Sequence, residues 1–490
     1  MNTKDAIHPN VDITDAQQHQ SNSCQESASL TRRRFLQGIA ATVATAGAAG
    51  FCPVSYAAKG GGGGGGGGGT VTRNPLKIPP IVSPTSYALQ AAPATVDIGG
   101  GKLSNLLAYN GQFPGPTFRA NTGDSANIAF SNGLVDETTV HWHGMLVPTA
   151  ADGHPRDVVM PGGSYNYQFP IVQRACLNWY HPHPDMMTGE QVALGLAGAF
   201  IINDAEEAAL GLPSGCYEVP LVIRDTKLDR NNNLTYSAKS SGFLGTIPLV
   251  NGTLDPTLDV DTAIYRFRVL CGSNARVFKL VLSNGAQFTL IGNDGGLLSS
   301  AVTIGQIEFS PGERLDLLVD FRGLAVGTKV LLQDQNSGWT LLEFNVTRQV
   351  NAGGVIPTGT LSSIVPLSNP ILTREFSFDG MSRINGNVYD INRIDFQVPF
   401  GQTELWRFTT GGNAPHPVHV HGASFQVVSR SGGRGVLYPW EQGWKDTVLL
   451  QDGESVDVLV RFDAYRGLYI IHCHKLEHED MGMMANFEVI

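Results

Sequence analysis

The chain has 490 residues, of which 42% are hydrophobic and 16% charged, and its formal net charge is -10. This length and composition predict a globular protein of about three domains. The acidic balance argues against a nucleic-acid partner, whose binding surface would be basic, and weakly against binding to an anionic membrane.

The first 57 residues are predicted to be an export signal. Residues 31–36, TRRRFL, resemble a twin-arginine motif, and an apolar Ala/Gly-rich run follows at 38–51. Ser55 and Ala57 offer a small-x-small cleavage site. A transmembrane anchor is the weaker alternative, because a membrane span needs ~20 apolar residues. We expect a periplasmic or secreted mature protein, exported by the twin-arginine route, with no stable membrane association after cleavage.

Residues 58–69 are expected to form a glycine-rich linker, because an unbroken glycine run has no fold of its own. After signal removal, four cysteines stay in the chain. An oxidising compartment would permit a disulfide among Cys176, Cys216 and Cys271, and their spacing leaves the pairing open. We exclude Cys473 from this set, because the histidines on either side of it suggest a metal ligand.

From residue 70 onward, short alternating segments bounded by Gly, Pro, Asn and Asp predict an all-β protein. One pattern occurs three times: a turn at Pro161, Pro311 or Asp452 leads into alternating apolar residues. A His-x-His segment follows the first and third copies but not the second. We infer three related β-sandwich domains, of which the outer two supply metal ligands and the middle one supplies none. Their expected bounds are 70–204, 218–348 and 370–490, with a linker at 351–369.

Four His-x-His segments dominate the chain, at 141–143, 181–183, 419–421 and 472–474. In a β-strand, residues i and i+2 point to the same face, so each segment can offer two imidazoles to one metal cluster. One such segment could be a zinc site or an accident, but four make an accident implausible, and zinc would favour closed four-ligand sets. Eight imidazoles suit three copper ions with open positions for oxygen. Because the ligands come from both ends of the chain, we expect the first and third domains to meet at the cluster.

Cys473 indicates a second kind of site. A thiolate, two imidazoles and a weak thioether form the ligand set of a blue-copper electron-transfer centre. His478 and Met483 follow Cys473 closely enough for a turn to bring both to one metal. His416 is the natural second imidazole, because it precedes the pair at 419–421 and needs a separate role. The alternative for Met483 is an ordinary place in the core.

Together these segments resemble the four copper signatures of the multicopper oxidases. The resemblance extends over residues 75–490 through the motifs at 113–116, 195–198, 293–296 and 444–447. It is strongest to the bacterial three-domain members, namely spore-coat-type laccases, bilirubin oxidases and cuprous oxidases. The resemblance implies three cupredoxin-like Greek-key β-sandwich domains and four copper ions per chain: one type 1, one type 2 and a type 3 pair.

The resemblance also implies a role for each ligand. The type 1 copper would be held by His416, Cys473, His478 and Met483, and the type 2 copper by His141 and His419. The type 3 pair would be held by His143, His181, His183, His421, His472 and His474. Electrons would enter at the type 1 site and pass through Cys473 to its neighbouring histidines, and four one-electron steps would reduce O2 to two waters.

Three carboxylates are candidate catalytic residues. Reduction of O2 consumes protons, so acids near the cluster are required, and by similarity Asp152 and Glu479 are candidates for a proton relay. Either could instead be a solvated loop acid. Asp446 resembles a carboxylate that lies beside a type 1 histidine in the relatives, where it could accept a proton, steer a cationic donor or be purely structural.

The electron donor is the least determined feature. An axial thioether stabilises oxidised copper, which favours easily oxidised donors such as phenols and aromatic amines. Cuprous oxidases of this family carry a methionine-rich insertion in the third domain. In the corresponding region here, residues 351–400, Met381 is the only methionine. We therefore rank a laccase-like oxidase first and a periplasmic cuprous oxidase in copper tolerance second.

Two readings from other classes fit less well: a division or scaffold protein that has lost copper, and a copper-dependent nitrite reductase. The expected partners are O2 and a small-molecule electron donor, and the expected oligomeric state is a monomer.

Overall fold

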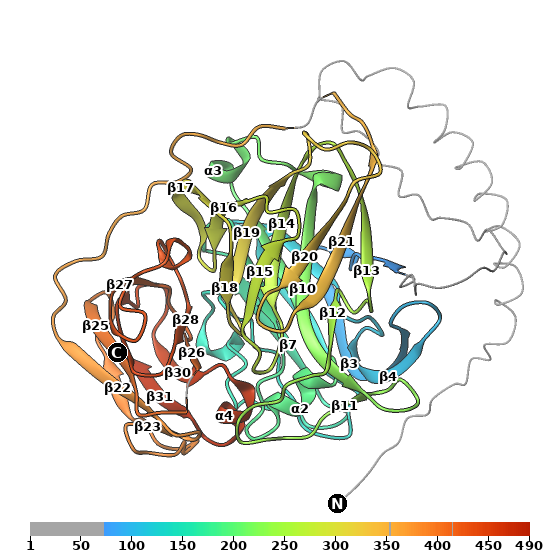
Figure 1. Ribbon diagram of the computed structural model, residues 1–490. Coiled ribbons are helices and arrows are strands. Elements are labelled where there is room, and N and C mark those ends of the chain that lie inside the picture. The colour runs from blue at the N-terminus through green and yellow to red at the C-terminus, as the bar shows by residue number, and fades with distance from the viewer. Residues whose placement is uncertain (1–72, 352–353, 414) are drawn as a thin grey trace, which may run out of the picture. The chain divides into compact units, whose positions relative to one another are not determined.

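The computed structural model describes residues 73–351, 354–413 and 415–490. The expected export signal and glycine-rich linker lie outside these residues. The described part of the chain is a set of β-sandwiches with a few short helices (Figure 1). Within that part, none of the helices has both the length and the apolar character needed to cross a membrane.

The first sandwich consists of two four-stranded sheets, with orders β4-β3-β6-β7 and β2-β5-β9-β8. Alternation in the sequence builds it: along β6, buried Ala126, Ile128 and Phe130 are interleaved with exposed Ser125, Asn127 and Ala129. The strands are β2 (Ile81–Val82), β3 (Tyr87–Asp97), β4 (Leu103–Tyr109), β5 (Thr117–Asn121), β6 (Ser125–Asn132), β7 (Ser164–Pro170), β8 (Cys176–Tyr180) and β9 (Gly198–Asn203). The helical elements are η1 (Thr149–Ala151), α2 (Thr188–Ala193) and α3 (Ala205–Ala208).

The middle sandwich packs a six-stranded sheet, β1-β13-β21-β20-β15-β18, on a seven-stranded sheet, β11-β10-β14-β19-β16-β17 with β12 beside β10. Its elements are β1 (Asn74–Pro75), η2 (Gly215–Tyr217), β10 (Glu218–Leu228), β11 (Leu234–Thr235), β12 (Ile247–Val250), β13 (Pro256–Asp261), β14 (Ile264–Cys271), β15 (Phe278–Leu282), β16 (Phe288–Asn293), β17 (Gly296–Ile304), β18 (Ile307–Phe309), β19 (Arg314–Asp320), β20 (Lys329–Asp334) and β21 (Trp339–Arg348). Strand β1 precedes the first sandwich in sequence but pairs with β13, so residues 74–75 belong to the middle one.

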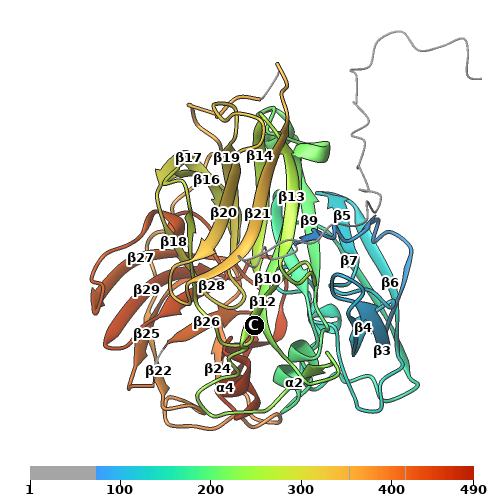
Figure 2. The same ribbon diagram turned by 45° about the vertical axis from the view of Figure 1, so that its right-hand side comes forward.

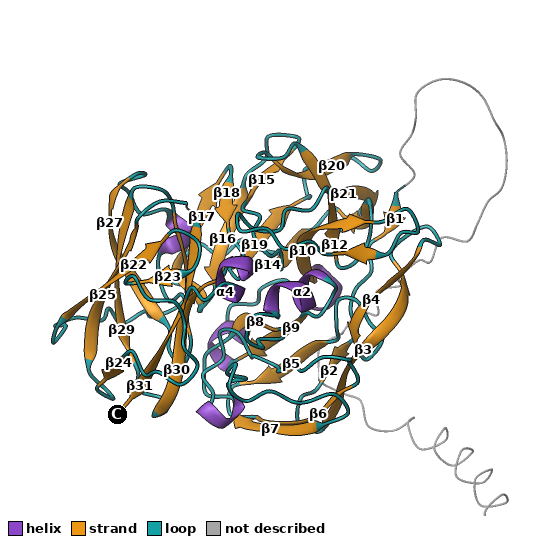
Figure 3. Ribbon diagram, turned by 90° about the horizontal axis from the view of Figure 1, so that it is seen from below, coloured by secondary structure: helices purple, strands orange, loops and turns teal. Residues whose placement is uncertain are grey.

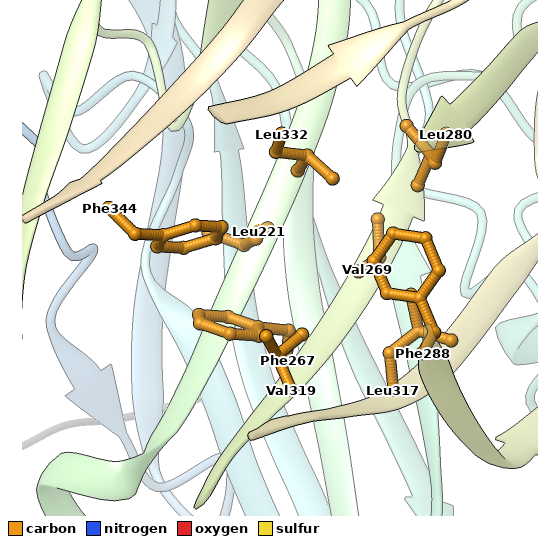
Figure 4. A pocket seen from close by; sticks show the side chains of 9 residues that line it. All are labelled: Leu221, Phe267, Val269, Leu280, Phe288, Leu317, Val319, Leu332 and Phe344. Carbon is orange, nitrogen blue, oxygen red and sulfur yellow. The ribbon is translucent and has the colours of Figure 1, made fainter. Parts of the chain in front are cut away.

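Figure 4 shows the apolar side chains that face one another between the two sheets of the middle sandwich. They surround a small void whose lining is wholly apolar: Leu221, Phe267, Val269, Leu280, Phe288, Leu317, Val319, Leu332 and Phe344. Such a lining offers no polar group to orient a ligand, so the void is part of the packed core.

The third sandwich contains two five-stranded sheets, β23-β22-β25-β29-β27 and β24-β31-β30-β26-β28. Its core is centred on Trp406, whose ring packs against Phe376, Phe396, Phe462 and Phe487. The elements are β22 (Thr373–Asp379), β23 (Arg383–Ile384), β24 (Phe396–Val398), β25 (Thr403–Thr410), β26 (His416–Val420), β27 (Phe425–Gly432), η3 (Pro439–Glu441), β28 (Thr447–Leu450), β29 (Glu454–Arg461), β30 (Gly467–Cys473), α4 (Leu476–Asp480) and β31 (Met484–Val489).

The first and third sandwiches meet at helices α2 and α4, which lie side by side (Figures 2 and 3). The carboxylate of Asp480 at the end of α4 accepts hydrogen bonds from the backbone N–H groups of Thr188 and Gly189, both at 2.9 Å. These bonds satisfy two amides at the first turn of α2, which have no partner inside the helix. The described thiols Cys176 and Cys271 are buried and free, so no disulfide joins these two.

Candidate metal centre

Backbone pairing brings the four His-x-His segments together. In the first sandwich, His141 and His181 form an antiparallel bridge, in which the N–H of His141 donates to the carbonyl of His181 at 2.8 Å. In the third sandwich, β26 pairs with β30 so that His419 lies opposite His472. Each pairing places two of the four segments next to each other. The interface between the first and third sandwiches then brings the two pairs together.

The eight imidazoles form three buried groups whose ligand nitrogens lie within 4.8 Å of one another: His141 with His143 and His419; His143 with His181 and His474; and His183 with His421 and His472. All three groups combine residues of the first and third sandwiches. The last two are the six histidines expected at the type 3 pair, and the first contains both histidines expected at the type 2 copper.

In three of the rings, hydrogen bonds fix which nitrogen is available to bind a metal. The Nδ1–H groups of His141, His419 and His181 donate to the carbonyls of Asp152, Asp446 and Pro182, at 2.7, 2.8 and 2.8 Å. Their Nε2 atoms are buried without a hydrogen-bond partner. A buried polar atom without a partner is costly, and a neutral imidazole nitrogen is a good copper ligand. The residues present therefore fit bound copper.

Burial keeps the imidazoles neutral. It holds the pKa values of His141, His181 and His474 well below the ordinary range, and repulsion between neighbouring rings adds to the effect. A neutral ring has the free lone pair that a metal ligand needs. The cluster is thus ready to bind cations near neutral pH.

Cys473, His416 and His478 form a separate buried site. The Sγ atom of Cys473 lies 3.5 Å from Nδ1 of His416 and 3.8 Å from Nδ1 of His478, and the two Nδ1 atoms are 3.2 Å apart. Burial raises the pKa of the Cys473 thiol to about 12. The thiolate therefore needs a bound cation to form at neutral pH, as expected of a metal ligand.

Met483 is fully buried and held close to this site. Its N–H donates to the carbonyl of His478 at 2.9 Å, and its carbonyl accepts from the N–H of Cys473 at 3.1 Å. Met483 is also part of the core of the third sandwich, so proximity to the site and core packing are both features of this residue.

The backbone joins the two sites directly. His472 and His474 flank Cys473, and each belongs to a different group of the eight-histidine cluster. The Nδ1–H of His472 also lies 3.2 Å from the carbonyl oxygen of Cys473. A few bonds thus connect the thiolate site to both type 3 groups.

Asp152 and Glu479 lie against the cluster and are buried, which excludes the alternative of solvated loop acids. Asp152 Oδ2 accepts from Nδ1 of His421 at 2.9 Å. The two oxygens of Glu479 lie 3.3 Å from Nδ1 of His183 and 3.0 Å from Nδ1 of His472. Burial raises the pKa of both carboxyls.

The expectation for Asp446 needs correction. Its carboxylate does not flank a histidine of the Cys473 site but contacts the eight-histidine cluster: Oδ1 lies 3.1 Å from Nε2 of His143 and 3.4 Å from Nδ1 of His419. It is 2% exposed, so it has no surface from which to steer a donor. Burial alone would raise the pKa of this carboxyl, but the Arg314 guanidinium holds it well below the usual range.

Sequence reasoning missed Arg314, which belongs to the middle sandwich. Its guanidinium pairs with both oxygens of Asp446. Asp294 supports the same region: its carboxylate accepts from the N–H of Arg314 at 2.8 Å and lies 2.9 Å from Nζ of Lys445. The sequence feature that could have indicated Arg314 is its position: it directly follows the turn at Pro311, in the second copy of the repeated pattern.

Comparison with known proteins relates the chain to multicopper oxidases over most of its length. Two family models described as "Multicopper oxidase" match residues 90–207 and 364–490. The chain is 30% identical over 463 residues to a laccase of Bacillus subtilis, covering 79% of this chain and 90% of that protein. It is 31% identical over 485 residues to the cell division protein FtsP of Dickeya dadantii, covering 93% and 98%. The McoA multicopper oxidase structure from Aquifex aeolicus is 34% identical, with a TM-score of 0.80 and coverage of 86% and 100%.

Proposed function

Because the chain belongs to the multicopper oxidase family, we propose that it is a laccase-like enzyme that oxidises phenols or aromatic amines by single electrons. Its class is that of a copper-dependent oxidase, with O2 as the acceptor. Bound copper supplies the one-electron redox chemistry, and the protein supplies the ligands, the electron path and the proton donors.

The ligand assignment follows from the groups of side chains. His416, Cys473 and His478, with Met483, would hold the type 1 copper. His141 and His419 would hold the type 2 copper, and the two remaining groups of three histidines would hold the type 3 pair. The complete ligand set distinguishes the chain from a copper-free scaffold protein with the same fold.

Protons for the reduction of O2 would come from Glu479 and Asp152. Glu479 bridges His183 and His472 and is fully buried. Burial raises its pKa, so this carboxyl holds a proton at a higher pH than a solvated glutamic acid does. An acid with this property beside the histidine cluster suits a proton donor.

The donor class rests on one observation: residues 351–400, where cuprous oxidases of this family carry a methionine-rich insertion, contain a single methionine. The end of β22 lies beside His416, with ring centroids of Phe378 and His416 6.1 Å apart. Met381 follows in the β22–β23 turn and is the only methionine between 351 and 400. A soft Cu(I) donor favours several thioether ligands, whereas a phenol needs none. This supports an organic donor over Cu(I).

The test is O2 uptake by copper-loaded protein with 2,6-dimethoxyphenol, measured with and without excess Cu(II). We expect uptake without added copper, and the same uptake from Met381→Leu. Uptake only with added copper, abolished by Met381→Leu, would replace the phenol proposal by a cuprous oxidase. Copper content is measured on the same samples, so that a loss of O2 uptake can be distinguished from a loss of copper.

We also propose export to the periplasm or beyond by the twin-arginine route, on the basis of residues 31–36. Replacing Arg32 and Arg33 with lysine should keep the protein in the cytoplasm. Unchanged export of that variant would contradict the proposal.

A further inference from the structure

The guanidinium of Arg314 forms its hydrogen bonds inside the protein, close to the copper cluster, although the middle sandwich provides no copper ligand. The side chain is fully buried. Nε donates to the carbonyl of Leu177 at 2.9 Å, and Nη1 donates to the carbonyl of Gly312 at 2.8 Å and to Oδ1 of Asp446 at 2.7 Å. Nη2 donates to Oδ2 of the same carboxylate. The result is a bidentate arginine–carboxylate pair, the most directional form of this interaction.

Asp446 in turn contacts two imidazoles of the cluster through different atoms. Its carboxylate accepts from Nε2 of His143 at 3.1 Å, and its backbone carbonyl accepts from Nδ1 of His419 at 2.8 Å. The rings of His143 and His419 are stacked, with centroids 3.6 Å apart and planes 9° apart. Asp446 thus contacts both His143, a ligand expected at the type 3 pair, and His419, a ligand expected at the type 2 copper.

Two oxygens lie 3.1 Å from Nε2 of His143: Oδ1 of Asp446 and the hydroxyl oxygen of Thr447, which itself donates to the same Oδ1 at 2.9 Å. A neutral imidazole that donates through Nε2 has its lone pair on Nδ1, and Nδ1 of His143 faces Nε2 of His474 at 3.1 Å. His141, His181 and His419 have the opposite arrangement, since they donate through Nδ1 and leave Nε2 for the metal. His143 therefore needs a buried acceptor on its Nε2 side, which Asp446 provides.

The backbone is shaped to admit this pair. A Cβ at Gly144, directly after His143, would lie 2.5 Å from Nη2 of Arg314 and 2.8 Å from Oδ2 of Asp446. Gly144 also has a φ of +84°, a conformation that favours glycine. A side chain at this position would displace the guanidinium, so the glycine of the His-Trp-His-Gly motif makes room for an arginine from another domain.

We propose that Arg314 is a positioning residue for the copper cluster: by fixing the Asp446 carboxylate, it sets His143, whose ring stacks on that of His419, to bind metal through Nδ1. The middle sandwich thereby takes part in the copper site without ligating copper. Lysine cannot replace this function, because an ammonium group lacks the planar fork that pairs with both carboxylate oxygens.

The central test is the copper-loaded Arg314→Lys variant. Residues that orient metal-bound histidines typically contribute about 10–100-fold to metal affinity or activity. We expect a loss of this size in copper affinity at the eight-histidine cluster, together with a changed type 2 electron paramagnetic resonance signal. The blue absorption of the type 1 copper should be retained, because Arg314 does not contact that site. None of these measurements depends on the electron donor, so they stand or fall separately from the phenol proposal.

Arg268→Lys is the matched control. Arg268 lies on the neighbouring strand β14, is equally buried and is paired with Glu207 and Glu218, but it does not contact a histidine. It should lose stability without any change in the type 2 signal or copper content. Asp446→Asn should reproduce the Arg314→Lys spectrum, and the double variant should be no worse than either single one, because both act through one pair. A wild-type spectrum and copper content in Arg314→Lys, or the same change in Arg268→Lys, would overturn the proposal.

Discussion

His154 is a buried histidine outside the copper ligands, and it should make the enzyme sensitive to acid. Its Nδ1 accepts from the N–H of Arg156 at 3.1 Å, and its Nε2–H lies 2.9 Å from Oδ1 of Asn486. Burial is the main cause that lowers its pKa to about 4. Because the folded pKa is below the unfolded one, the unfolded chain takes up the proton first. Stability therefore falls as the pH drops below about 6.5 and stops falling near the folded pKa.

The size of this effect follows from the two pKa values. Between about pH 7 and pH 5, one histidine with these pKa values changes the free energy of unfolding by about 1.8 kcal/mol. His154→Gln removes the titrating group, so its stability should fall less over this interval, by that difference. The comparison between the two proteins cancels the contributions of all other groups, whatever the baseline cost of the substitution.

The assay is denaturant unfolding of both proteins in the copper-loaded form at the two pH values, with copper retention checked in each sample. Parallel loss of stability in wild type and His154→Gln would refute the reasoning, since it would mean that His154 is not buried in a neutral form. A steeper loss in the variant would refute it as well, because the sign of the linkage would then be reversed.

Three further predictions concern the copper sites and the core. Met483→Leu should raise the reduction potential of the type 1 copper, because a weak ligand of the oxidised ion is lost; Met484→Leu, at an equally buried neighbour, should leave the potential unchanged in the same redox titration. Glu479→Gln should slow O2 consumption by about 10²–10⁴-fold, the usual contribution of a general acid, while anaerobic bleaching of the blue colour by a phenol keeps its rate; equal slowing of both steps would contradict the role of a proton donor. Trp406→Ala should lower the free energy of unfolding by about 3–5 kcal/mol, measured by denaturant titration, and a loss below 1.5 kcal/mol would mean that the surrounding phenylalanines close the cavity.

Much of the site could be predicted because it is encoded locally. The i and i+2 spacing predicts that both imidazoles of each segment share one face, and the place of Cys473 between two histidines predicts that the two sites are joined. Alternation likewise predicted the strands, as in β29, where Val456, Val458 and Val460 are buried.

What could not be predicted depends on contacts between distant segments. The contact of Asp446 with the eight-histidine cluster could not be predicted, because its position is set by the pairing of β26 with β28, where His419 lies opposite Thr447. Arg314 carries no metal-binding chemistry of its own, and its function arises from a carboxylate 132 residues later. Strand β1 was not assigned to the middle sandwich, because two residues contain no pattern that identifies a partner strand.

The division of the cluster between the first and third sandwiches fixes when copper can be acquired during synthesis. His141, His143, His181 and His183 are translated long before the other four imidazoles, which come from residues 419–474. A chain interrupted at 351–369 would have only four of the eight cluster imidazoles, all on one sandwich, and no Cys473 thiolate to deliver electrons. Copper loading of a complete site is therefore a late event, which must follow both translation and the docking of the two outer domains.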